Sequence, residues 1–176
     1  MDEDLKEKLL QSERVFNGVL LKVNRDIVVL PNGKEATREW IEHPGAVAVV
    51  PFCEDGRIAM VRQFRYPTGK VMLEVPAGKL DLNEKAEECV LRELKEETGY
   101  TARKIRRLTS IATTPGFSNE VIHLYIAEDL VQGAQCPDED EFIHVVKYSK
   151  TEIKKMIQDG TIDDAKSILA LMLAGI

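Results

Sequence analysis

The sequence predicts an α/β fold, namely an α/β/α sandwich with a mixed sheet, preceded by a small N-terminal β-sheet subdomain. Short stretches rich in β-branched and aromatic residues recur along the chain, separated by turn-forming residues. One glutamate-rich segment near the middle and two segments near the C-terminus have instead the apolar spacing of helices. Strands that flank one central helix, followed by a helix pair, are typical of helices that cover both sides of a sheet.

Residues 1–43 are expected to form an N-terminal helix and β-sheet subdomain. Residues 2–11 form a short charged helix in this prediction, because Leu5, Leu9 and Leu10 share one side. Three strands are then expected, broken by turn-like Asn-Arg-Asp and Pro-Asn-Gly sequences, at residues 14–23, 27–30 and 35–42. Because strands with so little apolar content need a partner surface, we expect this sheet to mediate a homodimer.

Residues 44–176 are expected to form the main domain. It opens after a His-Pro-Gly break, and a Glu-Asp-Gly turn at residues 54–56 indicates a hairpin. Strands are expected at residues 46–52, 57–64, 71–75, 105–113, 121–127 and 142–148. The two C-terminal helices are expected at residues 149–159 and 163–174.

The glutamate-rich segment is expected to form a helix over residues 84–98. Asn83 is the expected N-cap, and Gly99 suits the left-handed residue that ends a helix. At about 100° per residue, one side of this helix is an apolar arc that should face the core. The arc consists of Ala86, Cys89, Val90, Leu91 and Leu94.

Two glutamates of this helix fall inside the apolar arc. Glu93 and Glu97 point toward the core in this arrangement, and Glu96 lies on its flank. A buried carboxylate must be neutralised by an arginine, a proton or a hard cation. Arg92 is the local counter-charge, but one arginine does not balance three carboxylates. The cluster therefore favours Mg²⁺, with Mn²⁺ as a possible substitute, since both prefer oxygen ligands.

Composition narrows the class of protein. The chain has 176 residues, of which 44% are hydrophobic and 31% charged, which fits one globular domain with a small appendage. The net charge of −6 argues against a nucleic-acid partner. We expect no membrane association and a cytoplasmic location, since apolar runs stay well below the ~20 residues of a membrane span and the first residues are acidic. Three scattered cysteines, Cys53, Cys89 and Cys136, are interpreted as reduced thiols.

The glutamate-rich segment also matches a known motif. Gly78, Glu84, Arg92-Glu93-Leu94, Glu96-Glu97 and Gly99 resemble the signature of the Nudix hydrolases, G-x5-E-x7-R-E-U-x-E-E-x-G-U, where U is a bulky aliphatic residue. Tyr100 departs from the last position. The resemblance implies the Nudix fold and hydrolysis of a nucleoside diphosphate linked to another group.

The same resemblance implies a ligand set. Glu93 and Glu97 would bind the metal, with Glu96 assisting and the carbonyl of Ala77 completing the set. Glu141, in the acidic loop 137–142, would be an extra ligand. Arg92 would orient a glutamate, and Glu84 would pair with it.

Segments outside the motif resemble the ADP-ribose pyrophosphatase branch of this family. They include Thr37-Arg38-Glu39, the segment from Glu74 to Gly78, and a Pro115-Gly116 pair that lies 16 positions after Gly99. The implied reaction is hydrolysis of ADP-ribose to AMP and ribose 5-phosphate. A Nudix hydrolase of another ADP-sugar or of an oxidised nucleotide, and a non-catalytic ADP-ribose sensor, are the alternatives.

Roles for further residues follow from this second resemblance. Arg65 and Arg38 would contact the diphosphate or terminal ribose, and Phe16 or Trp40 would stack on the adenine. Glu139 matches the catalytic base, and Glu120 competes with it because it closely follows the Pro-Gly turn. The predicted substrate contacts are completed by Glu39, Gly78, Pro115 and Glu120.

Overall fold

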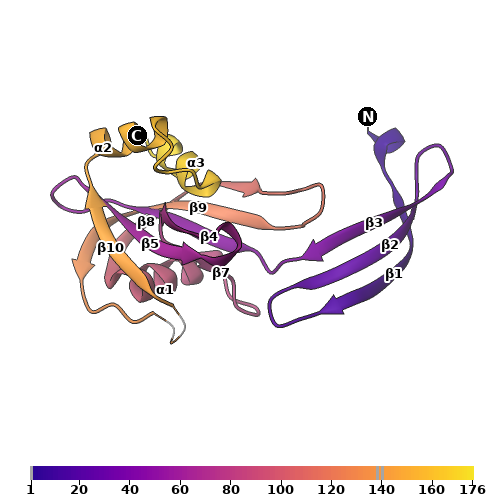
Figure 1. Cartoon of the computed structure of the whole chain (residues 1–176), viewed down its shortest axis with the longest axis horizontal. Helices are drawn as coiled ribbons and strands as arrows, with labels where there is room; N and C mark the ends of the chain where they lie inside the picture. The colour runs from indigo at the N-terminus through magenta and orange to yellow at the C-terminus, as the bar shows by residue number, and fades with distance from the viewer. Residues whose placement is uncertain (1, 138, 140) are drawn as a thin grey trace. The chain divides into compact units, whose positions relative to one another are not determined.

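The computed structural model describes residues 2–137, 139 and 141–176, and Figure 1 shows its elements. The chain divides into two compact units. One comprises Met1–Gly45 with Ala112–Val121, and the other Ala46–Ile111 with Ile122–Ile176.

The N-terminal unit is a three-stranded antiparallel sheet. After a 3₁₀ turn at Glu3–Leu5, β1 (Lys8–Asn17), β2 (Lys22–Val29) and β3 (Glu35–Glu42) pair in the order β1-β2-β3. The predicted helix over residues 2–11 is wrong, because the backbone from Lys8 onward bonds to β2 instead. A helix of this length lacks the stability to compete with a strand ladder.

The predicted turn at residues 24–26 is also wrong. These residues lie in the middle of β2, where Asn24 pairs with Trp40 and Asp26 pairs with Arg38. The Asp26 carboxylate accepts hydrogen bonds from Ser12 Oγ at 2.6 Å and from Trp40 Nε1 at 2.8 Å. Neighbours on both sides therefore override the local turn preference of Asn and Asp.

In its described residues, the second unit contains two sheets and three α-helices. Its first strands are β4 (Ala46–Pro51), β5 (Ile58–Arg65), β6 (Lys70–Glu74) and β7 (Ala77–Lys79), with a 3₁₀ turn at Tyr66–Thr68. They are followed by α1 (Ala86–Thr98), β8 (Tyr100–Ala112), β9 (Val121–Gln132), β10 (Ile143–Tyr148), α2 (Lys150–Gln158) and α3 (Ala165–Leu173).

Strand pairing confirms the predicted α/β fold with a mixed sheet. One sheet has the order β10-β5-β6 and is antiparallel. The other has the order β7-β4-β9-β8, and in it β4 runs parallel to β9 and antiparallel to β7. The short strand β7 was missed by the sequence analysis, and it carries two of the predicted site residues, Ala77 and Gly78.

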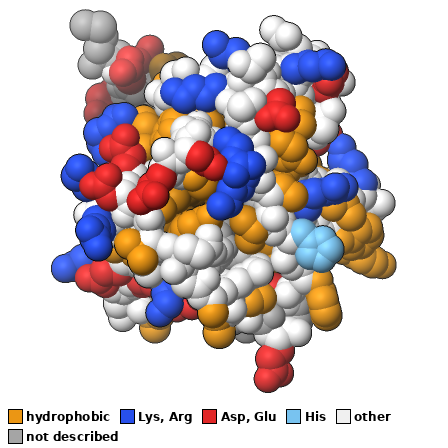
Figure 2. Space-filling model, turned by 90° about the vertical axis from the view of Figure 1, so that its left-hand side faces the viewer, with side chains coloured by type: hydrophobic (Ala, Val, Ile, Leu, Met, Phe, Trp, Pro, Cys, Tyr) orange, Lys and Arg blue, Asp and Glu red, His pale blue; other side chains and the backbone are white. Residues whose placement is uncertain are grey.

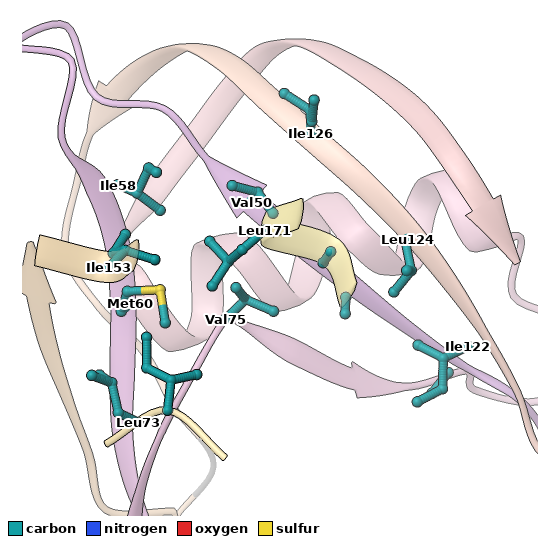
Figure 3. Packing of buried hydrophobic residues seen from close by; sticks show 14 residues of the cluster. Val50, Ile58, Met60, Leu73, Val75, Ile122, Leu124, Ile126, Ile153 and Leu171 are labelled. Atoms are coloured by element: carbon teal, nitrogen blue, oxygen red, sulfur yellow. The ribbon is translucent and has the colours of Figure 1, made fainter. Parts of the chain in front are cut away.

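Strand β4 separates two apolar cores, and every residue in it is buried. Ala46, Ala48 and Val50 face a cluster with α2 and α3, part of which Figure 3 shows around Met60, Val75 and Leu171. Val47 and Val49 face a second cluster with α1. A strand covered on both faces reads as a continuous apolar run rather than an alternating one. This is why residues 46–51 carried no alternation in the sequence.

Helix α1 begins two residues later than predicted. Asn83 has a φ of 65° and belongs to the preceding turn, so its prediction as the N-cap is wrong; Lys85 occupies that position. The Glu84 carboxylate accepts a hydrogen bond from the Asp81 N–H at 3.0 Å and is therefore part of the loop. Gly99 has a φ of 75° and ends the helix, as predicted.

The apolar arc of α1 is largely confirmed. Cys89, Val90 and Leu94 are fully buried in the second core, and Ala86 packs against it. Leu91 is 37% exposed, so its assignment to the arc is wrong. It lies at the edge of the arc, where the helix surface turns toward solvent.

The surface carries charges of both signs. On the face in Figure 2, Lys and Arg side chains are interspersed with Asp and Glu side chains and with hydrophobic groups. Of the helices in the described part of the chain, none has the length and apolarity that a bilayer crossing requires.

Candidate active site

Strand β7 and helix α1 bring Gly78 and Glu93 into direct contact. A Cβ atom built on Gly78 would lie only 1.9–2.2 Å from the carboxylate atoms of Glu93. A side chain larger than hydrogen at Gly78 would therefore displace the Glu93 carboxylate from this position. The glycine of the motif serves to admit the Glu93 carboxylate against the backbone of the loop.

Glu97 is the most deeply buried carboxylate of α1, with 3% of its surface exposed. Its Oε2 atom accepts a hydrogen bond from the Ala77 N–H at 3.1 Å. Burial raises the pKa of Glu97 to about 8, with Glu93 and Glu141 adding repulsion and the Ala77 hydrogen bond opposing the shift. Burial likewise raises the pKa of Glu93, against the attraction of Arg92. Both inward positions predicted from the helix spacing are confirmed.

Arg92 connects three glutamates through a single guanidinium group. Its Nε and Nη2 atoms each donate to the Glu84 carboxylate at 2.8 Å. Its Nη1 atom donates to Glu93 Oε1 at 2.8 Å and to Glu96 Oε2 at 2.9 Å. The hydrogen bond from Arg92 lowers the pKa of Glu84 to about 2, so Glu84 is a permanent anion that fixes the arginine. Arg92 thereby sets the positions of Glu93 and Glu96.

The acidic loop before β10 is described in part. Glu139 is an exposed turn residue, while Asp138 and Asp140 lie outside the described residues. The charge of Glu141 contributes to the raised pKa values of both Glu93 and Glu97. Glu141 therefore lies within electrostatic reach of the two inward glutamates.

Arg65 ends β5 and is engaged by a carboxylate that the sequence analysis did not single out. Its Nε and Nη2 atoms donate to the two oxygens of Glu74 at 2.8 and 2.9 Å. The hydrogen bond to Glu74 raises the pKa of Arg65, and the charge of Glu97 adds to this rise. Two of its five N–H groups donate to Glu74, and no acceptor among the described residues takes the other three.

The remaining predicted site residues belong to the N-terminal unit. Phe16 is 55% exposed on β1, and Trp40 is half-buried on β3. Arg38 Nε donates to Glu7 at 3.0 Å, and its neighbour Glu39 is exposed. Pro115 is exposed in the turn between β8 and β9.

Glu120 is held within the same unit. Its carboxylate accepts a hydrogen bond from Thr113 Oγ1 and lies 3.4 Å from His43 Nε2. The structure thus brings together Arg92, Arg65 and the predicted ligands in one unit, with Phe16, Arg38, Glu39, Trp40, Pro115 and Glu120 in the other.

Comparison with known proteins identifies the family. The NUDIX domain model matches residues 42–171, and the model for the nucleoside diphosphate sugar hydrolase N-terminal domain matches residues 7–41. The chain belongs to the Nudix family. Its Nudix domain contains every carboxylate of the cluster on α1.

Relatives of this Nudix protein extend over nearly its whole length. It is 41% identical to the ADP-ribose pyrophosphatase of Bacillus subtilis, over 96% of this chain and 92% of the relative. It is also 41% identical to the methanol dehydrogenase activator of Bacillus methanolicus, over 97% of this chain and 94% of the relative. A crystal structure of an ADP compounds hydrolase superposes with a TM-score of 0.85 at 25% identity, covering 96% of this chain and 92% of the other.

Nudix hydrolases generally use a divalent metal, and the residues of this chain fit one. Four carboxylates supply oxygen donors, the ligand type that hard cations prefer. Gly78 lets the Glu93 carboxylate lie against the backbone of the loop. Burial raises the pKa of Glu97 to about 8, although the Ala77 N–H and the charge of Arg65 both oppose this rise. Among the described residues, no three acidic, histidine or cysteine side chains are arranged around one point, and Arg92 donates hydrogen bonds to Glu93 and Glu96.

Two partners of the site were assigned no role from the sequence. Glu74 is a carboxylate within the otherwise apolar stretch of residues 71–75, and its side chain is 2% exposed. Lys166 on α3 bonds to it from a distant part of the chain. The signal that could have identified Glu74 is the one that identified Glu97, namely an acid at a position expected to face the core.

Proposed function

We propose that this Nudix hydrolase cleaves the diphosphate of ADP-ribose to AMP and ribose 5-phosphate with the help of Mg²⁺, for which Mn²⁺ can substitute. The observation that carries the proposal is the convergence of Glu93 and Glu97 on the Ala77-Gly78 backbone. The near full-length similarity to a protein named ADP-ribose pyrophosphatase supports the choice of substrate.

The proposed metal ligands are the α1 carboxylates, the loop carboxylate and one backbone carbonyl: Ala77, Glu93, Glu96, Glu97 and Glu141. When bound, a divalent cation neutralises phosphate oxygens and makes water a better nucleophile at neutral pH. Arg92 contributes by orienting Glu93 and Glu96 through its hydrogen bonds.

The diphosphate is proposed to contact Arg65 and Arg38. The guanidinium of Arg65 suits this role, since its planar set of donors matches phosphate oxygens and its edge is already oriented by Glu74. Stacking of the adenine on Phe16 or Trp40 would supply affinity that phosphates shared by all nucleotides do not provide. Glu39, Gly78, Pro115 and Glu120 complete the proposed binding site.

Two residues compete for the role of catalytic base. Glu139 is exposed and belongs to the same unit as the proposed metal ligands. Glu120 already accepts a hydrogen bond from Thr113 and neighbours His43. We propose Glu139 as the base, because its carboxylate is open to water. Replacing each by glutamine separates them, since only loss of the base removes the ionisation that limits kcat at low pH.

A second candidate is hydrolysis of another nucleoside diphosphate derivative. Two similarities favour it: residues 7–41 match a nucleoside diphosphate sugar hydrolase N-terminal domain, and 96% of the chain superposes on an ADP compounds hydrolase. A panel of ADP-ribose, other ADP-sugars and oxidised nucleotides decides between the candidates by kcat/KM. A non-catalytic ADP-ribose sensor would bind ADP-ribose in the same panel without cleaving it.

We also propose that the protein is a cytoplasmic homodimer. The N-terminal sheet exposes large apolar side chains, including Leu9, Val15 and Phe16, which need a cover. Its cysteines are free thiols, as a reducing compartment allows. Light scattering of the purified protein tests the dimer.

The decisive experiment incubates the protein with ADP-ribose and Mg²⁺ and measures AMP. We expect AMP to form, and near-complete loss of turnover in Glu93→Gln and Glu97→Gln with the fold retained. Equal turnover in Glu97→Gln would remove the metal assignment.

A further inference from the structure

A network of ion pairs outside the Nudix motif joins Arg65, Glu74 and Lys166. The Glu74 carboxylate is almost completely buried, yet it is ionised and engages two cations. Arg65 approaches it side-on with two parallel hydrogen bonds, at 2.8 and 2.9 Å. Such bidentate pairing fixes the plane of a guanidinium group as well as its position.

Lys166 approaches the same carboxylate from the first turn of α3. Its side chain is 14% exposed, and the ammonium group donates both to Glu74 Oε2 and, at 2.9 Å, to Asp164 Oδ2. Asp164 in turn caps α3 by accepting hydrogen bonds from the Ser167 N–H at 2.9 Å and from the Ser167 hydroxyl at 2.5 Å. The ammonium group is therefore held by two carboxylates and has little freedom to leave Glu74.

A second set of contacts also joins α3 to the end of β6. The Ser167 hydroxyl oxygen accepts a hydrogen bond from the Val75 N–H at 2.9 Å. Leu73 and Val75, which flank Glu74, belong to the same apolar cluster as Leu171 of α3 (Figure 3). The first turn of α3 thus braces the end of β6 only two to three residues before Ala77.

These contacts hold the end of β6 close to the backbone segment that carries Ala77 and Gly78. Arg65 is held by Glu74, which lies three residues before Ala77. The Ala77 N–H donates a hydrogen bond to the inward carboxylate of Glu97, so the brace and the site share this short segment of backbone. Without Glu74 the Arg65 guanidinium would lose the paired hydrogen bonds that fix its plane. Without Lys166 the Glu74 carboxylate would have Arg65 as its principal cation, and the pair would be free to shift together.

We propose that Glu74 and Lys166 are positioning residues that hold the Arg65 guanidinium in the plane in which its free edge receives the substrate diphosphate. The inference rests on the proposed function, since it names how one substrate contact is preorganised. It assigns α3, which contains none of the Nudix motif, a role in substrate affinity.

The test is a double-mutant cycle with Arg65→Gln and Lys166→Met, measured as kcat and KM for ADP-ribose with Mg²⁺. We expect Lys166→Met alone to raise KM roughly tenfold, the usual effect of losing an oriented hydrogen bond to a charged group, while kcat changes little. In the Arg65→Gln background the same substitution should change KM less than about twofold, because the residue it acts through is gone. Lys166→Arg should restore most of the affinity.

Lys154→Met is the matched control, because Lys154 is an exposed lysine on the neighbouring helix α2. It should leave both constants unchanged. Thermal denaturation of each variant shows whether the fold is retained, and Glu74→Asp, which keeps the charge but shortens the side chain, replaces Lys166→Met if that variant does not fold.

Two outcomes separate the inference from the proposed function. A wild-type chain that cleaves ADP-ribose, together with equal effects of Lys166→Met in both backgrounds, would show a general structural role and overturn the inference alone. A wild-type chain that leaves ADP-ribose intact would overturn the proposed function and the inference with it.

Discussion

Replacing Glu97 by glutamine should stabilise the metal-free protein while abolishing its activity. The pKa of Glu97 rises from 4.5 to about 8 on folding, so between these pH values the folded chain keeps a proton that the unfolded chain releases. The contribution to stability is therefore fully present below pH 4.5 and is lost as the pH rises toward 8. Glutamine has nearly the same shape, accepts the same hydrogen bond from the Ala77 N–H, and does not ionise.

The magnitude follows from the same two values. Each pH unit between them costs about 1.4 kcal/mol, so the wild-type chain loses about 3 kcal/mol by pH 7 but under about 1 kcal/mol at pH 5. Glu97→Gln should therefore exceed wild type in free energy of unfolding by up to about 3 kcal/mol at pH 7, with the advantage largely gone at pH 5. Because Glu97 is 3% exposed, solvent screening reduces this figure little.

Urea denaturation with a chelator at pH 5 and pH 7 measures this difference. Adding Mg²⁺ should then stabilise wild type by about 2.7 kcal/mol at a hundredfold excess over its dissociation constant, and Glu97→Gln by at least about 1 kcal/mol less. Asp163→Asn, at an exposed acid paired with Lys70, is a control that should show neither effect. An advantage of Glu97→Gln that is absent, or equal at both pH values, would refute the reasoning.

Three other substitutions test separate parts of the account. Gly78→Ala should displace the Glu93 carboxylate, since the Cβ of the alanine would lie about 2 Å from that carboxylate. We expect kcat to fall about a hundredfold with folding retained. Unchanged kcat would mean that Glu93 does not act from this position. Arg92→Lys should lower kcat/KM roughly 10- to 100-fold, because a lysine cannot bond to Glu84, Glu93 and Glu96 at once. Full activity of this variant would show that these hydrogen bonds are dispensable. Ser149→Ala removes the capping box of α2 and should cost about 1 kcal/mol, seen as a melting temperature lower by about 2–4 °C with normal activity.

Local patterns were enough to predict the central helix and its inward acids. The arc of Cys89, Val90 and Leu94 and the positions of Glu93 and Glu97 follow from helical spacing alone. Gly99 was predictable for the same reason, because a left-handed residue at a helix end favours glycine whatever the tertiary context.

Features that depend on distant parts of the chain were not predictable in this way. Residues 24–26 form a strand only because β1 and β3 pair with them on both sides. The short strand β7 has no pattern of its own and exists through its pairing with β4. The contact between Glu74 and Lys166 joins residues 92 positions apart, and nothing in the sequence near Glu74 indicates which cation balances it.

Direct metal binding tests the central claim most closely. Titration of the protein with Mn²⁺, followed by the loss of the free-ion signal in electron paramagnetic resonance, measures affinity without reference to any substrate. We expect saturable binding by wild type and binding at least about tenfold weaker in both Glu93→Gln and Glu97→Gln. Equal Mn²⁺ affinity in wild type and in these two variants would contradict it.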